Sequence, residues 1–214
     1  MRVLVIGGSG RTGGGVVRKL LKGAHEVSVL SRRAEVQDGA RAVQGSIIEP
    51  DDVRRAVAGQ EGVVIVVESA DADDAPNSPE RVHYQGVKHV IEAAESGTHV
   101  VLVTQIYITR TDAYPEVRNV IRWRGEGEEV LRQSGLPYTI IRPSWLTDEP
   151  GGEQGLRLEQ GDAGEGKVTR EDVTEACVQA LTHDEARDKT FELYNEPSEP
   201  SGEWALLFAG LESD

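Results

Sequence analysis

The stretch RVLVIGGSGRTGGGVVRKLL, residues 2–21, decides which fold this sequence predicts. It opens with a short run of aliphatic residues, which is typical of a buried strand. Apolar residues then recur at Val16, Val17, Leu20 and Leu21, so we expect a helix over residues 12–22. A strand, a glycine-rich turn and a helix therefore follow one another directly.

The glycines of this turn have separate roles in a dinucleotide-binding loop. Gly7 permits a tight turn, Gly10 lets a pyrophosphate approach the backbone, and Gly13 lets the helix pack closely on the strand. The helix N-terminus attracts negative charge. The alternative, a glycine-rich turn that binds nothing, leaves this cluster of helix-destabilising residues unexplained. The cofactor contacts expected in the loop are Gly7, Ser9, Gly10, Arg11, Thr12 and Gly13.

The rest of the chain repeats the alternation of short aliphatic runs with helical periodicity. Further strands are expected at residues 26–30, 41–45, 63–67, 99–103, 137–143 and 190–194. Helices are expected at residues 50–58, 79–96, 120–131 and 170–181. This order predicts an α/β fold of the Rossmann type, a doubly wound parallel sheet of about seven strands with helices on both faces. With 214 residues, we expect a single domain over residues 1–214.

Two stretches interrupt this alternation and are rich in acids, Gly, Pro and Ser. They are residues 68–80 and residues 148–167, and both are interpreted as loops. Each follows a strand, so each is expected at the carboxyl edge of the sheet, where ligands bind. The second is long enough to form a small flap on the substrate side. Solvated surface loops are the alternative.

The charge balance excludes some classes of partner. The chain has 23 Lys and Arg against 37 Asp and Glu, a net charge of -14, which disfavours nucleic acid and anionic membranes. Such a surface suits a salt-rich cytoplasm, although ordinary bacterial proteins can be equally acidic. A single cysteine, Cys177, excludes an intramolecular disulfide and offers no metal-site spacing, so no metal is expected. The short apolar run at the N-terminus is neither a signal peptide nor a membrane span, so we expect a cytoplasmic protein. The expected oligomeric state is a monomer or a homodimer.

The second expected strand points to NADP rather than NAD as the cofactor. It is followed by Ser31, Arg32 and Arg33, where an NAD-specific domain usually presents an acid to the ribose hydroxyls. A guanidinium binds a 2′-phosphate through charge-assisted hydrogen bonds, and a serine hydroxyl adds another. Of the two arginines, Arg32 is the preferred candidate. The alternative is a solvated arginine pair.

Several longer strings resemble a known family. GGSGRTGGGVVRKLL, PERVHYQGVKHVIEAAESGTHVVLV, LRQSGLPYTIIRPSWLTDEPGG and VTREDVTEACVQAL are together similar to atypical short-chain dehydrogenases/reductases of the NmrA-like and biliverdin-reductase-B-like kind. The resemblance covers nearly the whole chain and is closest to small single-domain plant and bacterial members. It implies an NADP cofactor, a pyrophosphate at residues 7–13 and a 2′-phosphate contact at Arg32.

The same resemblance implies further cofactor contacts. The family usually has Gly-Asp-hydrophobic after its third strand, and here Ser46 and Ile47 follow Gly45, so the adenine contact loses its aspartate. Ser69 is the expected polar contact of the adenine-side ribose. Thr104 and Gln105 stand where a serine pair is frequent, and Pro143 stands where the backbone approaches the nicotinamide. Trp145 could form one wall of a flat substrate pocket or belong to the core.

Catalysis in the family's carbonyl reductases depends on a Tyr-x-x-x-Lys pair, and this chain departs from it. In VIRWRGEGEEVL, residues 120–131, Arg124 takes the lysine position and Val120 the tyrosine position. The helical spacing also puts Arg124 on the apolar face. We expect its guanidinium to bind the nicotinamide ribose without shuttling a proton. The alternative is an i,i+4 ion pair with Glu128.

The identity of a proton donor stays open. Tyr107, which follows the fifth strand, and Tyr84 could replace the missing tyrosine, although packing is the commoner role of such residues. Tyr107 and Arg124 are therefore the weak catalytic candidates. The function expected is an NADPH-dependent oxidoreductase that passes a hydride to a small acceptor such as a flavin or quinone. An NADP-binding redox sensor that regulates an unknown partner is the alternative, and a nucleotide-sugar epimerase or dehydratase is the weaker one.

Overall fold

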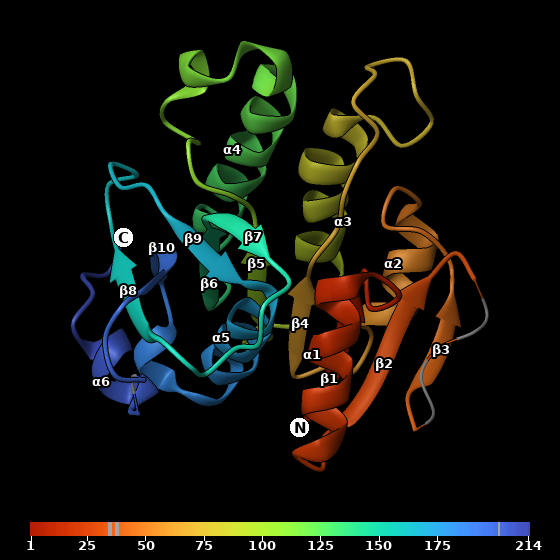
Figure 1. Ribbon diagram of the computed structural model, residues 1–214. Helices are drawn as coiled ribbons and strands as arrows, with labels where there is room; N and C mark the ends of the chain where they lie inside the picture. The colour runs from red at the N-terminus through yellow and green to blue at the C-terminus, as the bar shows by residue number, and fades with distance from the viewer. Residues whose placement is uncertain (34–35, 37–38, 201) are drawn as a thin grey trace.

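The computed structural model describes residues 1–33, 36, 39–200 and 202–214 and shows a central sheet flanked by helices (Figure 1). Its strands are β1 (Arg2–Ile6), β2 (Glu26–Ser31), β3 (Arg41–Gln44), β4 (Gly62–Ile65), β5 (His99–Val103), β6 (Tyr138–Pro143), β7 (Trp145–Thr147), β8 (Gly155–Glu159), β9 (Lys167–Thr169) and β10 (Lys189–Glu196). The α-helices are α1 (Arg11–Lys22), α2 (Pro50–Val57), α3 (Gly86–Ala93), α4 (Arg118–Arg132), α5 (Arg170–Thr182) and α6 (Trp204–Ala209).

The main sheet has eight strands in the order β3-β2-β1-β4-β5-β6-β10-β8. The first seven in this order pair in parallel, and they are the seven that the sequence predicts. The chain order reverses between β1 and β4, as in a doubly wound sheet. The predicted α/β fold with a Rossmann-type sheet is therefore confirmed.

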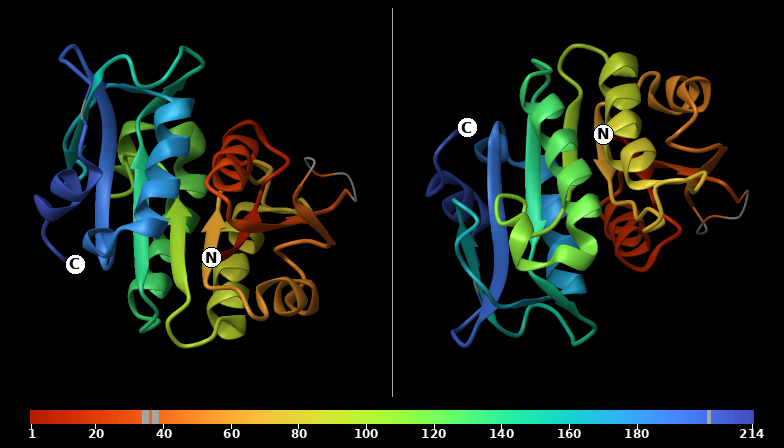
Figure 2. Two further views of the ribbon diagram at one scale, coloured as in Figure 1. Left: turned by 90° about the horizontal axis from the view of Figure 1, so that it is seen from below. Right: turned by 90° about the horizontal axis from the view of Figure 1, so that it is seen from above.

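Alternate residues of each strand enter opposite cores. In β1, Val3 and Val5 belong to the core shared with α1 and α5, whereas Leu4 and Ile6 belong to the core on the other face. Strands buried on both faces read as continuous aliphatic runs rather than as an alternating pattern. Figure 2 shows α1 and α5 on one side of the sheet and α2 and α3 on the other.

The strand count was underestimated, because residues 148–167 are not loop throughout. Their centre forms β8, which pairs antiparallel with β10 at the edge of the main sheet. Leu156 is buried and Leu158 packs on the same core. Only these two residues alternate among glycines and charged residues, which is too short a pattern to indicate a strand. The segment lies between β7 and β9, which pair in parallel as a separate two-stranded sheet.

Helices near the carboxyl edge depart slightly from their predicted bounds. The helix expected at residues 79–96 begins with a π-helical turn, η1 (Glu80–Gln85), and ends with α3 at Ala93. Gly127 explains one of the glycines in α4, because a Cβ there would overlap the carbonyl oxygen of His83 in η1. The glycine thus lets α4 lie directly against η1. Residues 68–80 form the predicted loop up to the start of η1.

None of the helices in the described part of the chain is both long and apolar enough to cross a membrane.

Candidate functional site

The glycine loop after β1 has the geometry of a phosphate cradle. Gly7 adopts φ +91°, and a Cβ there would overlap the carbonyl oxygen of Val66. The N–H of Gly10 donates to the carbonyl of Gly7 at 2.9 Å, which closes the turn. A Cβ on Gly13 would overlap the same Gly7 carbonyl, so the start of α1 lies directly against the loop. Only glycine fits at both positions.

The N-terminus of α1 presents backbone N–H groups and the positive end of the helix dipole. Gly10 caps the helix without a side-chain hydrogen bond, and the first turn carries no acidic residue. Thr12 is buried, and its Oγ1 accepts a hydrogen bond from Arg170 at 3.0 Å. Arg11 extends into solvent and pairs with Asp148 at 2.8 Å. This arrangement suits an anion at the helix N-terminus.

Parallel strands bring the predicted cofactor residues to one edge of the sheet. Each predicted position lies at or just after the carboxyl end of a parallel strand, and the strands β3, β2, β1, β4, β5 and β6 follow one another in the sheet. The exception is Arg124, which reaches the same edge from α4. The positions are Ser46 and Ile47; Ser31, Arg32 and Arg33; Gly7, Ser9, Gly10, Arg11, Thr12 and Gly13; Ser69; Thr104; and Pro143.

At the β2–β3 end of this edge, the predicted side chains differ in how far they are exposed to solvent and so to a ligand. Arg32 and Arg33 are exposed, whereas Ser31 is buried and its Oγ accepts the N–H of Arg33 at 3.2 Å. Ser46 donates its N–H to Asp52 at 3.0 Å. The side chain of Ile47 is 7% exposed and belongs to the core, against Gly86 of α3.

A cavity of about 360 Å³ lies at the other end of the edge, beyond α1. It combines aliphatic walls with a few convergent polar groups, which is typical of small-molecule sites. Of the predicted residues, it brings together Thr12, Thr104, Gln105, Tyr107, Arg124, Pro143 and Trp145. Its full lining is Thr12, Val66, Val67, Glu68, Val103, Thr104, Gln105, Ile106, Tyr107, Arg124, Pro143, Ser144, Trp145, Leu146 and Val173.

Arg124 is buried in this cavity wall, only 7% exposed. Its Nη2 lies 2.5 Å from Glu68 Oε2, and its Nη1 donates to Gln105 Oε1 at 2.6 Å and to the Thr104 carbonyl at 3.4 Å. Burial lowers the pKa of Arg124, and the facing Glu68 carboxylate opposes that shift. The Nε atom is buried and has no hydrogen-bond partner among the described residues.

The alternative interpretation of Arg124, a surface pair with Glu128, is wrong. Glu128 is fully buried and lies 2.6 Å from Arg142 and 2.9 Å from Arg132, one turn along α4. It also accepts the hydroxyl of Thr104 at 2.6 Å. Because these donors occupy its carboxylate, Arg124 pairs instead with Glu68, which lines the same cavity.

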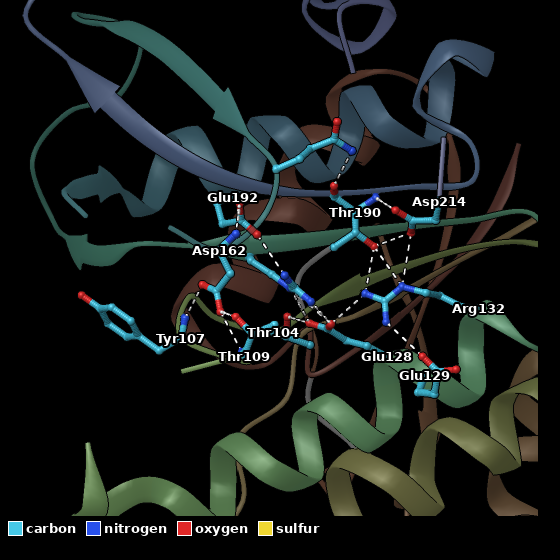
Figure 3. A network of polar contacts seen from close by, with 12 residues as sticks. Thr104, Tyr107, Thr109, Glu128, Glu129, Arg132, Asp162, Thr190, Glu192 and Asp214 are labelled. Atoms are coloured by element: carbon cyan, nitrogen blue, oxygen red, sulfur yellow. Dashed lines mark hydrogen bonds and ion pairs between the residues drawn. The ribbon is translucent and has the colours of Figure 1, made fainter. Parts of the chain in front are cut away.

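A network of polar contacts extends from Glu128 to Asp162 on one side and to Asp214 on the other (Figure 3). Arg142 also contacts Glu192 at 3.0 Å, and Glu192 accepts the N–H of Asp162 at 3.0 Å. Burial opposes the charged form of Arg142, but its hydrogen bonds to Glu128 and Glu192 raise its pKa overall. Burial raises the pKa of Glu192. The network joins α4, β6, β10 and the segment between β8 and β9.

His83 of η1 lies beside Arg124 at the boundary between the two ends of the edge. Its Nε2 is 3.2 Å from Ser69 Oγ, the predicted ribose contact. Burial, together with the charge of Arg124, lowers the pKa of His83 to about 3. The imidazole is therefore neutral at physiological pH.

Aromatic side chains form the outer wall of the cavity. The ring of Tyr107 lies 4.6 Å from that of Tyr114 and 6.2 Å from that of Trp145. Trp145 is 54% exposed, so it belongs to the wall of the cavity rather than to the core. Tyr84, the other tyrosine candidate, packs on Trp123 at 5.7 Å and is not part of the cavity lining.

Some residues of the site were not predicted. Glu68 opens the acidic loop after β4, and Asp162 lies in a Gly- and Asp-rich turn between β8 and β9. Neither stands in a motif, and their partners are distant in sequence, so no local pattern indicates them. The position of Glu68, directly after a parallel strand, is the one available signal.

The residues present fit a nicotinamide dinucleotide at this edge. The cradle at Gly7 and Gly13 admits a group against bare backbone, and the N-terminus of α1 suits a pyrophosphate. The unpartnered Nε of Arg124 is a buried donor at the opposite end. A bound dinucleotide would thus find hydrogen-bond donors for its pyrophosphate at the N-terminus of α1 and for a ribose at Arg124.

Comparisons with known proteins agree with this geometry. The chain is 28% identical to sanguinarine reductase from Eschscholzia californica, with 99% of this chain and 94% of the relative covered. Among solved structures, a putative NAD-dependent epimerase/dehydratase from Bacillus halodurans has a TM-score of 0.84 at 23% identity, covering 99% of this chain and 100% of the other. A short-chain dehydrogenase/reductase from Veillonella parvula in complex with NADP has a TM-score of 0.72 at 16% identity, covering 94% and 99%.

Residues 7–184 match the sequence profile of one family, described as NAD(P)H-binding. The matched range begins at the first glycine of the loop after β1 and includes every residue that lines the cavity. The chain belongs to the NAD(P)H-binding family.

Proposed function

We propose that this protein is an NADPH-dependent reductase that passes a hydride to a planar small-molecule acceptor such as a flavin or a quinone. The observation that carries the proposal is the cavity at the ends of β5 and β6, with buried Arg124 in one wall and the aromatic side chains of Tyr107 and Trp145 in another. The name of the plant relative, a reductase, supports the same class of reaction.

NADP is the cofactor we propose, rather than NAD. Arg32 and Arg33 are exposed directly after β2, where a 2′-phosphate would meet two guanidinium groups. Ser31 adds a hydroxyl at the same strand end. The solved relative that contains NADP supports the choice.

Each part of the edge has a separate task in this proposal. The backbone N–H groups at the start of α1 and the hydroxyl of Thr12 would hold the pyrophosphate. When bound, the reduced nicotinamide supplies the hydride. Arg124, fixed between Glu68 and Gln105, would hold the nicotinamide ribose through its guanidinium. The guanidinium keeps its proton near neutral pH, so Arg124 orients the ribose and does not donate a proton.

A flavin or quinone suits a site without the Tyr-x-x-x-Lys pair. Val120, at the tyrosine position, lies outside the cavity lining. Reduction of such acceptors relies on the cofactor for the hydride and on the protein for geometry. The proton that follows the hydride would come from solvent, which reaches the exposed Trp145 of the cavity lining.

The second candidate function is an NADP-binding redox sensor. One observation favours it, because the hydroxyl of Thr104, one of the two positions where the resemblance implies a serine pair, is donated to buried Glu128 rather than left free for a substrate. A sensor would bind NADPH without oxidising it in the presence of any acceptor.

The test combines turnover with cofactor binding. Purified protein is mixed with NADPH and a panel of flavins, quinones, sanguinarine and small aldehydes, and NADPH oxidation is followed by absorbance. We expect oxidation with at least one planar acceptor and none with the aldehydes. Tight NADPH binding with no oxidation across the panel would contradict the reductase and favour the sensor.

Cofactor preference is tested with Arg32→Ala. Losing a charge-assisted contact to the 2′-phosphate should weaken NADPH binding by about 10- to 100-fold, since such bonds contribute roughly 1.5–3 kcal/mol. NADH lacks this phosphate, so its affinity should not change and serves as the internal control. Equal affinities of the wild-type protein for NADPH and NADH would contradict the assignment of NADP.

A further inference from the structure

Asp162 is a fully buried carboxylate that binds the loop after β5 from another part of the chain. Its Oδ1 accepts the N–H of Tyr107 at 2.6 Å, and its Oδ2 accepts the N–H and the hydroxyl of Thr109 at 2.8 and 2.9 Å. No ion pair engages this carboxylate within the described residues, so these three donors are what compensate its burial.

The backbone that Asp162 holds is in an unusual conformation. Tyr107 adopts φ +72°, in the left-handed region that non-glycine residues seldom occupy. Such a conformation persists only where surrounding contacts fix it, and it is concentrated at functional sites. The hydrogen bond from the Tyr107 N–H to Asp162 is such a contact. Figure 3 shows the tyrosine ring extending away from Asp162 on the other side of its backbone.

Asp162 is itself held in place by the buried network. Its N–H donates to Glu192, which pairs with Arg142, which in turn pairs with Glu128 of α4. The position of the carboxylate is therefore set by β6, β10 and α4 together. These are the elements that also place Arg124 and Pro143 in the cavity wall.

A second link joins the same two segments. The guanidinium of Arg110 lies 4.6 Å from the centroid of the Tyr107 ring and donates to the carbonyl of Gly164 at 2.8 Å. Tyr107 then contacts Tyr114, and both rings face Trp145. The turn at residues 162–164 thus contacts Tyr107 twice, directly at its N–H and, through Arg110, at its ring.

We propose that Asp162 is a positioning residue for the acceptor: it holds Tyr107 in the left-handed conformation that makes the ring part of the cavity wall, and so determines which planar acceptors fit. The proposal rests on the proposed reductase function for its substrate class. Asp162 has no place in the cavity lining, so it acts through Tyr107 and not by touching the acceptor.

The test is Asp162→Asn, an isosteric change that turns one acceptor oxygen into an NH2 donor facing the donors of Tyr107 or Thr109. Steady-state kinetics with the best acceptor of the panel are measured beside the dissociation constant for NADPH. We expect kcat/KM for the acceptor to fall about 10- to 100-fold, mostly through KM, and the ranking of acceptors to change. The affinity for NADPH should be unchanged, because the hydrogen-bond partners of Asp162 are Tyr107, Thr109 and Glu192, none of which is a proposed cofactor contact.

A readout independent of turnover is the fluorescence of Trp145 in a Trp123→Phe/Trp204→Phe background, where Trp145 is the only tryptophan left of three. Asp162→Asn should change its emission and its quenching by added acceptor. The matched control is Asp188→Asn. Asp188 is exposed, has a left-handed backbone (φ +56°) as Asp162 does, and lies just before β10, at the edge of the sheet away from the cavity. Thr109→Val removes one of the three bonds and should give a smaller effect of the same kind.

Two results would overturn the proposal. One is an Asp162→Asn protein whose kinetics and Trp145 emission match those of Asp188→Asn. The other is a loss of NADPH affinity in step with acceptor turnover, which would indicate general unfolding. If the wild-type protein fails to oxidise NADPH in the presence of any acceptor of the panel, the reductase function fails. The Trp145 emission alone then still decides whether Asp162 positions the cavity wall.

Discussion

The glycine loop after β1 and the cavity after β5 and β6 lie at one edge of one sheet, yet different interactions form them. The loop consists of backbone that is shaped by the conformation of Gly7 and the missing side chains at Gly7 and Gly13. The cavity consists of side chains that a buried charge network holds in place, with Glu128 at its centre. The difference indicates that the glycine loop depends on local sequence, whereas the cavity depends on contacts between residues distant in sequence.

The largest expected effect comes from breaking the network. Glu128→Ala leaves Arg142 and Arg132 without their shared carboxylate, and removing one partner of a buried ion pair costs about 3–5 kcal/mol. The free energy of unfolding is measured by urea titration. Glu129→Ala is the matched control, because the neighbouring Glu129 is mostly exposed and its pair with Arg132 is worth less than about 1 kcal/mol. Similar losses in the two variants would show that the buried network does not stabilise the fold around the cavity.

A smaller effect is expected from the loop. Gly7→Ala places a Cβ on the carbonyl of Val66, whereas Gly59→Ala introduces a Cβ into open space at a similarly positive φ, +73°. Backbone strain is common to both variants, so the difference in unfolding free energy reports the overlap alone, about 1–3 kcal/mol. NADPH binding should weaken only in Gly7→Ala. Equal stability and equal binding in the two variants would show that the close approach is unimportant.

The smallest expected effect concerns His83, between the two ends. Its pKa is about 3 in the folded protein and near 6.5 when unfolded, because burial and Arg124 oppose its charge. The unfolded state therefore binds the proton first, so His83 contributes stability above pH 6.5 that is lost as the pH falls. Between pH 7.5 and 5.5 the wild-type protein should lose about 1 kcal/mol more than His83→Asn. Parallel pH profiles of the two proteins from urea titrations would contradict this assignment.

Sequence reasoning was sufficient where short-range patterns decide the structure. The strand, glycine loop and helix of residues 2–21 formed as predicted, and six further parallel strands were located correctly. The strand β8 was missed because Leu156 and Leu158 are the only alternating apolar residues in an otherwise loop-like composition.

The site was harder to predict where charge and backbone conformation depend on distant residues. The inward position of Arg124 was correct, yet its partner Glu68 is 56 residues away and no spacing rule connects them. Thr104 and Pro143 were placed by their strand ends. The contact between Asp162 and Tyr107 could not be predicted, because neither the composition nor the hydrophobic periodicity of a sequence indicates that a tyrosine has a positive φ.

Gly127 shows how an alanine scan of this protein would need to be interpreted. In an exposed helix, replacing glycine by alanine improves helix formation by about 1 kcal/mol. Here the added methyl would overlap the carbonyl oxygen of His83 and separate α4 from η1. Arg124 and Glu128 lie on the same helix within one turn of Gly127. The mildest substitution in the scan would therefore displace both the guanidinium of Arg124 and the carboxylate of Glu128 at once.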